Sequence, residues 1–142
     1  MEPQVTLEIP IGSLMSRSVL HLREQDGLDE AVELMVQAKS SCVVICRALV
    51  PRGIVTERDV TMLYTSPLPP SRDVPLASVM RAPVHTVCET DTLGDVLGTL
   101  ERLTSHHIPV VDANGELSGL VTQTDLLRAC ACLILGAPSS GG

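Results

Sequence analysis

The chain has 142 residues, of which 44% are hydrophobic and only one, Tyr64, is aromatic. This length suits one compact domain or two small interlocked ones. The net charge is −7, with ten basic residues and no basic run, which argues against a nucleic-acid-binding surface. The N-terminus lacks a signal-peptide pattern, and no apolar run approaches the roughly 20 residues that span a bilayer. We therefore expect a cytoplasmic protein with no membrane partner.

The cysteines form no recognisable disulfide or zinc pattern. They are odd in number, and no pair has the Cys-x-x-Cys spacing: Cys42, Cys46, Cys88, Cys130 and Cys132. Free thiols in a reducing compartment are therefore favoured over disulfides or a zinc site.

In chain order, the first half predicts a strand, a helix, two strands and a helix. Residues 18–22 form a strand-like run, and Asp26 is expected to cap the next helix. Apolar residues in that helix have the spacing of one face: Leu28, Ala31, Val32, Met35 and Val36. The apolar runs at 42–46 and 53–55 predict strands covered on both faces. A second helix is expected from Thr56 to about Tyr64.

The second half repeats this order. Strands are predicted at 84–87, 108–111 and 117–121, and Asn114-Gly115 favours a type I′ turn between the last two. Asp91 is expected to cap a helix with an apolar face of Leu93, Val96, Leu97, Leu100 and Leu103. A last helix should run from Thr122 to Leu135 and end at Gly136 and Pro138.

The expected domain boundaries follow this repetition. Residues 10–66 form the first unit and 75–135 the second, joined by a proline-rich linker at 67–74. A helical turn is expected at 74–80, and the tail at 136–142 is expected to be disordered.

One phrase of eight residues occurs twice. Gly53-Ile-Val-Thr-Glu-Arg-Asp-Val60 returns as Gly119-Leu-Val-Thr-Gln-Thr-Asp-Leu126, 66 residues later. The frame shared by both copies is Gly, two aliphatic residues, Thr, two free positions, Asp and an aliphatic residue. A further match at an offset of 65 pairs Met15 with Met80. An internal repeat of this length indicates two copies of one supersecondary unit.

These residues resemble a tandem pair of cystathionine-β-synthase-type (CBS) domains, also called a Bateman module. The resemblance rests on both Gly-h-h-Thr-x-x-Asp phrases and on His107-Ile-Pro-Val-Val-Asp112, and it covers about residues 10–134. It implies a mixed α/β (α+β) fold of two βαββα units, packed sheet to sheet about a pseudo-twofold axis. It also implies a regulatory module that binds AMP, ADP, ATP or S-adenosylmethionine in clefts between the units, and a homodimer.

The Thr-x-x-Asp pairs, Thr56 with Asp59 and Thr122 with Asp125, are the main candidate nucleotide-binding residues. Each pair is placed where a strand turns into a helix, whose free N–H groups would suit a phosphate. An ionised aspartate can accept hydrogen bonds from both ribose hydroxyls. The same spacing is also that of a capping box, which needs no ligand. Both interpretations remain open from the sequence alone.

The two copies differ in the residues that could contact a phosphate. Arg58 stands opposite Thr124, and His106-His107 stand opposite Ser41-Cys42. In the resembled family, basic residues before the second strand often reach phosphates, so Arg58, His106 and His107 are further nucleotide-binding candidates. A metal site at the two histidines is disfavoured, because adjacent strand residues point to opposite faces.

Neither motif offers a nucleophile with an adjacent base, so we expect no enzyme activity, no metal and no cofactor. The adenine nucleotide would be a regulatory ligand, with an effector domain on the same or another chain. The alternative is an interaction module that only dimerises, as the regulatory fragment of a larger signalling protein.

Overall fold

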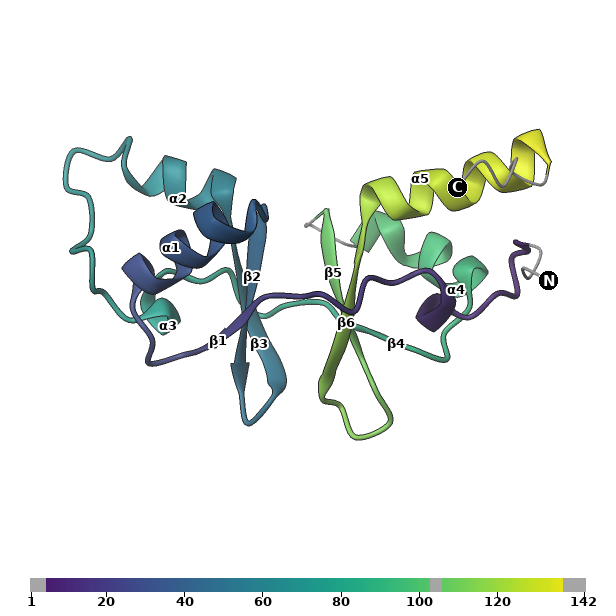
Figure 1. Cartoon of the computed structure of the whole chain (residues 1–142), viewed down its shortest axis with the longest axis horizontal. Coiled ribbons are helices and arrows are strands. Elements are labelled where there is room, and N and C mark those ends of the chain that lie inside the picture. Colours follow the sequence, from purple (N-terminus) through teal and green to yellow (C-terminus); the bar gives the residue numbers. More distant parts are fainter. Residues whose placement is uncertain (1–4, 103–105, 137–142) are drawn as a thin grey trace. The chain divides into compact units, whose positions relative to one another are not determined.

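The computed structural model describes residues 5–102 and 106–136, and these residues form two compact units (Figure 1). The first, here called the N-repeat unit, comprises residues 18–84. The second, the C-repeat unit, comprises 5–17 together with the described residues from 85 onward. Each unit has its own three-stranded sheet and its own hydrophobic core.

The N-repeat unit contains a mixed sheet with helices on one side (Figure 1). Its strands, in sheet order, are β1 (His21–Arg23), β2 (Cys42–Arg47) and β3 (Val50–Thr56). Strand β1 is parallel to β2, and β2 is antiparallel to β3. The helices are α1 (Leu28–Ala38), α2 (Glu57–Leu63) and the short α3 (Leu76–Val79). The buried core consists of Leu28, Ala31, Met35, Val43, Ile45, Val55 and Leu76.

The C-repeat unit has the same topology. Its strands are β4 (Val87–Cys88), β5 (His107–Val111) and β6 (Leu117–Thr122), with β4 parallel and β6 antiparallel to β5. The helices are α4 (Leu93–Thr99) and α5 (Gln123–Leu135), with 3-10 turns at Ile11–Ser13 and Leu100–Arg102. The predicted mixed fold of two βαββα units is therefore confirmed.

The segment before each repeat packs on the other repeat. Ile11, which is fully buried, lies in the core of the C-repeat unit, where its N–H donates to Asp91 O at 2.8 Å. Leu76 takes the same place in the N-repeat unit and donates to Asp26 O at 2.8 Å. The compact units therefore do not follow the expected boundaries of 10–66 and 75–135. Residues 10–17 belong with the second repeat and residues 75–84 with the first, and we call these two segments the arms. Each core includes an apolar side chain from its arm, Ile11 in one and Leu76 in the other.

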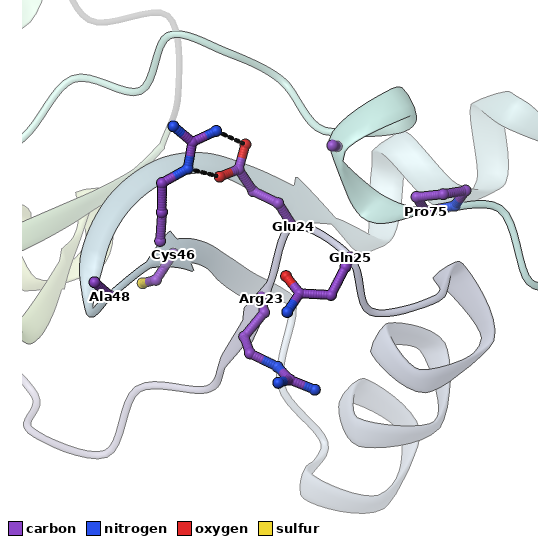
Figure 2. A pocket seen from close by; sticks show the side chains of 8 residues that line it. Arg23, Glu24, Gln25, Cys46, Ala48 and Pro75 are labelled. Atoms are coloured by element: carbon purple, nitrogen blue, oxygen red, sulfur yellow. Dashed lines mark hydrogen bonds and ion pairs between the residues drawn. The ribbon is translucent and has the colours of Figure 1, made fainter.

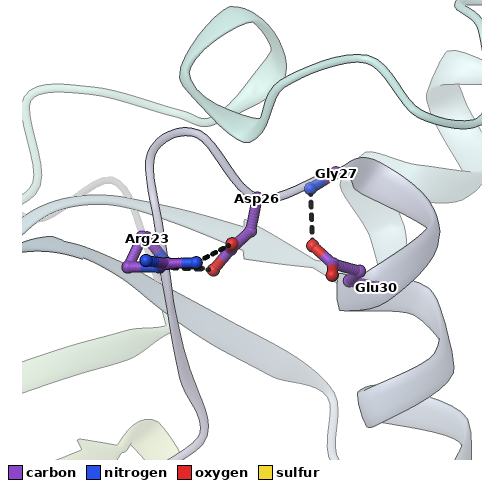
Figure 3. A network of polar contacts seen from close by, with 4 residues as sticks. All are labelled: Arg23, Asp26, Gly27 and Glu30. Carbon is purple, nitrogen blue, oxygen red and sulfur yellow. Dashed lines mark hydrogen bonds and ion pairs between the residues drawn. The ribbon is translucent and has the colours of Figure 1, made fainter.

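The helix caps differ from the predicted ones by one residue. Helix α1 is capped at Gly27, whose N–H donates to Glu30 at 2.8 Å (Figure 3). Asp26 instead accepts the N–H of Arg23 and forms an ion pair with its guanidinium at 3.0 Å. These bonds, from the Arg23 backbone and then its side chain, lower the pKa of Asp26. Helix α4 likewise starts after Thr92, and Asp91 accepts the N–H of Cys88. Each aspartate thus stabilises the turn before the helix.

Other local predictions need correction. The first strands of the repeats are shorter than 18–22 and 84–87, because only three and two residues pair. Val36 is 72% exposed, since it lies at the edge of the apolar face of α1. The β5–β6 turn is not type I′, because only Gly115 of the Asn114-Gly115 pair has a positive φ. Leu103, Pro138 and the expected disordered tail lie outside the described residues, apart from Gly136, which caps α5.

Candidate functional site

The first Thr-x-x-Asp pair lies at the junction of β3 and α2. Thr56 is the N-cap of α2, and its hydroxyl oxygen accepts the N–H of Asp59 at 3.1 Å. Asp59 Oδ2 accepts the N–H of Thr56 at 3.0 Å in return. We call these two residues the Asp59 site. The pair forms a reciprocal capping box, as the ligand-free interpretation predicts.

The second pair has the same geometry at the junction of β6 and α5. Thr122 Oγ1 accepts the N–H of Asp125 at 3.2 Å. Asp125 Oδ2 accepts both the N–H of Thr122 at 2.8 Å and its hydroxyl at 3.0 Å. Both of these capping bonds therefore use Oδ2. We call Thr122 and Asp125 the Asp125 site.

The helix starts offer a phosphate fewer N–H groups than the sequence predicts. The first helical N–H of α2, at Glu57, donates to Ser41 O at 2.9 Å. Its counterpart in α5, at Gln123, donates to His106 O at 2.9 Å. The third N–H of each helix is already bound by the cap threonine. Because two of the first three N–H groups are occupied, phosphate binding would depend mainly on side chains.

A third Thr-x-x-Asp pair shows that this capping geometry needs no ligand. Thr92 and Asp95 form the same reciprocal box at the start of α4, at 3.0 and 3.1 Å. Hydrogen bonds from the backbone and then the side chain of Thr92 lower the pKa of Asp95. This pair lies outside both repeated phrases, so it serves as an internal control for capping alone.

Arg81 is a charged neighbour of the Asp59 site that the sequence reasoning missed. Its Nη2 lies 2.6 Å from Asp59 Oδ1. Two backbone hydrogen bonds with Ile54 in β3, at 2.9 and 3.1 Å, hold Arg81 beside the motif. The available signal was the repeated methionine, because Arg81 follows Met80 as Ser16 follows Met15.

The three basic residues predicted to contact a phosphate, Arg58, His106 and His107, do not lie near the same motif. Arg58 is exposed on the first turn of α2. The ring Nδ1 of His106 contacts the side-chain oxygen of Gln123 at the start of α5. His107 lies directly opposite Thr122 in the β5–β6 register, so their side chains share one face of the sheet. The structure thus places His107 beside Thr122 and His106 beside Gln123, while Arg58 precedes Asp59 in α2.

One cavity of the N-repeat unit adjoins Asp59. Its volume is about 340 Å³, and it is lined by Asp59, Met62, Leu63, Ser66, Val79 and Arg81. A second cavity, of about 450 Å³, lies between the β2–β3 turn and α3 (Figure 2). There Arg47 pairs with Glu24 at 2.7 Å. That second cavity contains none of the predicted site residues.

Among the described residues, no group of three or more His, Cys, Asp and Glu side chains could hold a metal ion. None of the helices in the described ranges has the length and apolar character needed to cross a bilayer. All five cysteines are free, and burial raises the pKa of Cys42 and Cys46 to about 11.

Comparison with known proteins identifies the repeated unit. The family model described as CBS domain matches residues 11–65 and again 76–132. An uncharacterized protein of Methanopyrus kandleri is 26% identical over 84% of this chain, and an inosine-5'-monophosphate dehydrogenase of Chlorobaculum tepidum is 27% identical over 82%. This chain spans 62% of the first protein and 24% of the second.

A solved structure shares both the fold and the extent of this chain. It is a CBS domain protein from Pyrobaculum aerophilum complexed with AMP, with 25% identity and a TM-score of 0.76. The match covers 89% of this chain and 97% of that one. Since the family model matches both repeats and the topology agrees, the chain is a tandem CBS pair and belongs to the CBS domain family.

Proposed function

We propose that this chain is a regulatory module that binds an adenosine-containing nucleotide at the Asp59 and Asp125 sites. The observation that carries the proposal is that the helix cap uses only one of the two carboxylate oxygens of Asp125. Asp125 Oδ2 accepts both capping bonds from Thr122, so the cap does not use Oδ1. Capping and ligand binding are therefore compatible in one carboxylate.

The chemistry of the site suits a ribose. An ionised carboxylate only accepts hydrogen bonds, and the two adjacent ribose hydroxyls supply two donors. Such charge-assisted bonds are among the stronger ones in proteins. The similar CBS domain protein from Pyrobaculum aerophilum was solved with AMP, which supports an adenine nucleotide here. AMP, ADP, ATP and S-adenosylmethionine all carry the required adenosine group.

A thermal-shift panel of these four ligands tests the proposal. A ligand at 100 times its dissociation constant should add about 2.7 kcal/mol to the free energy of unfolding. The best ligand is expected to raise the melting temperature in proportion to the logarithm of its concentration. If no adenosine ligand shifts the melting temperature at millimolar concentration, the nucleotide function is wrong.

A pair of variants separates ligand binding from capping. Asp125→Ala should weaken nucleotide binding by roughly 1.5–3 kcal/mol, because a charge-assisted hydrogen bond is lost. Asp95→Ala removes the same kind of cap at α4 and should lower stability by about 1 kcal/mol without changing affinity. Calorimetric titration of both variants checks this. Equal affinities in both variants and the wild type would favour capping alone.

An interaction module that dimerises without a ligand is the second candidate function. The observation in its favour is the apolar surface of α5, where Leu127, Ile134 and Leu135 are 66%, 79% and 83% exposed. Leu126 and Ala129 do not contribute to this surface, because both lie in the core of their own unit. We propose a homodimer through α5 and an effector domain on the same or another chain. The dehydrogenase relative, of which this chain spans 24%, supports such an effector.

A further inference from the structure

The Asp59 site contains an ion pair between Asp59 and Arg81, and a serine, Ser16, occupies the position that matches Arg81 beside the Asp125 site. Arg81 Nη2 contacts Asp59 Oδ1 at 2.6 Å, while Oδ2 accepts the N–H of Thr56. Both oxygens of Asp59 are therefore in use before any ligand arrives. At Asp125, the capping bonds use Oδ2 alone.

The difference lies in one side chain on an otherwise equivalent backbone. Arg81 exchanges two hydrogen bonds with Ile54, at 2.9 and 3.1 Å. Ser16 exchanges the same two bonds with Leu120, at 2.8 and 2.9 Å. The two residues thus occupy matching positions beside the two motifs, and only one of them is charged.

The surroundings allow Arg81 to move while Asp59 stays in place. The Arg81 side chain is 47% exposed, and the Asp59 side chain is 16% exposed and fixed by the helix cap. Both line the 340 Å³ cavity, whose other walls include Met62, Leu63 and Val79. Within that lining, Arg81 and Asp59 are the charged residues.

We propose that Arg81 sets the ligand preference of the Asp59 site, favouring phosphorylated nucleotides over uncharged adenosine. This inference rests on the proposed nucleotide function. A ribose that donates hydrogen bonds to Asp59 has to compete with Arg81 for Oδ1. Adenosine offers the displaced guanidinium no anion, whereas a 5′-phosphate on the same ribose does. A guanidinium binds phosphate oxygens in bidentate fashion, so the nucleotide replaces the ion pair that it breaks.

The test compares AMP with adenosine at the Asp59 site alone. Asp125→Ala serves as the background, and binding is measured by calorimetric titration. In this background AMP should bind about tenfold more tightly than adenosine, as expected for a charge-assisted bond. Adding Arg81→Ser, which copies Ser16, should remove this preference. It should also strengthen adenosine binding by about fivefold, which is the upper range for a partly exposed ion pair.

Two further variants make the result specific. Arg23 forms a comparable pair with Asp26 at 3.0 Å, away from both motifs, so Arg23→Ser should leave the AMP-to-adenosine ratio unchanged. In the converse experiment, Ser16→Arg in an Asp59→Ala background should give the Asp125 site a preference for AMP. This variant decides the question if Arg81→Ser fails to fold.

The outcomes distinguish the two proposals. If Arg81→Ser folds and its AMP-to-adenosine affinity ratio is unchanged, the proposed role of Arg81 is wrong. If Arg81→Ser does not fold, an unchanged ratio in the Ser16→Arg variant leads to the same conclusion. The nucleotide function would then still stand, because the background protein binds AMP. If the wild-type chain binds neither AMP nor adenosine, the role of Arg81 is wrong. The nucleotide function is wrong as well only if no ligand of the thermal-shift panel binds.

Discussion

Met15 lies directly over Gly119, so that a β-carbon at Gly119 would be 2.6 Å from Met15 Sδ and 2.7 Å from Ser16 O. The same relationship joins Met80 to Gly53, where a β-carbon would lie 2.5 Å from Met80 Sδ. From the sequence alone, glycines at these positions predict the close approach of a ligand or of the partner unit. Within each compact unit they instead admit the chain's own arm, which crosses the strand that leads to the motif.

Replacing either glycine with alanine should destabilise the protein. Gly119→Ala and Gly53→Ala should each lower the free energy of unfolding by roughly 1–3 kcal/mol, because the arm has to shift. Gly98→Ala is the matched control, since a β-carbon on Gly98 in α4 would meet no atom of a neighbouring segment within 4 Å. It should raise stability by about 0.5–1 kcal/mol. Urea denaturation of the three variants measures this, and a stable Gly119→Ala would contradict the close contact.

Truncating Ile11 should loosen the C-repeat unit rather than the adjacent repeat. Ile11 is fully buried in the core with β5 and β6, so Ile11→Ala should cost about 2–5 kcal/mol. Hydrogen exchange should accelerate in β5 and β6 before it does so in β2 and β3. Leu76→Ala should give the opposite pattern, because Leu76 belongs to the other core. If Ile11→Ala instead accelerates hydrogen exchange in β2 and β3, Ile11 does not belong to the core of the C-repeat unit.

The buried thiols should resist modification in the native protein. Burial raises the pKa of Cys42 and Cys46 to about 11, and the thiolate is the reactive form. At pH 8 a thiol reagent should label Cys88, which is exposed, and leave Cys42 and Cys46 unmodified until the protein unfolds. Labelling of all five cysteines in the native state would show that these strands are not protected.

The same thiols predict a loss of stability at high pH. Their pKa is raised above the unfolded value of 9.0, so folding disfavours the thiolate. Their contribution to stability is complete below pH 9 and declines as the pH rises toward about 11. Cys42→Ala should flatten this decline, whereas Cys88→Ala should not. The unfolding free energy measured between pH 8 and 11 checks the difference.

The exposed face of α5 predicts a homodimer. Ile134→Glu should convert the dimer to a monomer, because a charge would replace an apolar side chain that is 79% exposed. Leu68→Glu is the control, since Leu68 is 88% exposed but lies outside α5. Light scattering at micromolar concentration distinguishes the two species. A monomeric wild-type protein would contradict the prediction.

The repeated unit, its order of strands and helices, and the place of both motifs could be predicted from the sequence. Apolar periodicity and the repeated phrase are local signals, and each Thr-x-x-Asp pair forms its cap within four residues. The helix starts were predicted one residue early, because Asp26 and Asp91 accept bonds in the preceding turn instead. That choice depends on which backbone N–H is nearest, which composition does not reveal.

The sequence did not predict which arm completes which core, or that Arg81 is the cation that contacts Asp59. Ile11 and Leu76 are equally apolar in sequence, so nothing local assigns either one to a sheet. Arg81 lies 22 residues from Asp59 along the chain, and the backbone pairing with Ile54 brings the two together. Contacts of this kind are set by packing between distant segments, whereas the signals in the sequence are those of near neighbours.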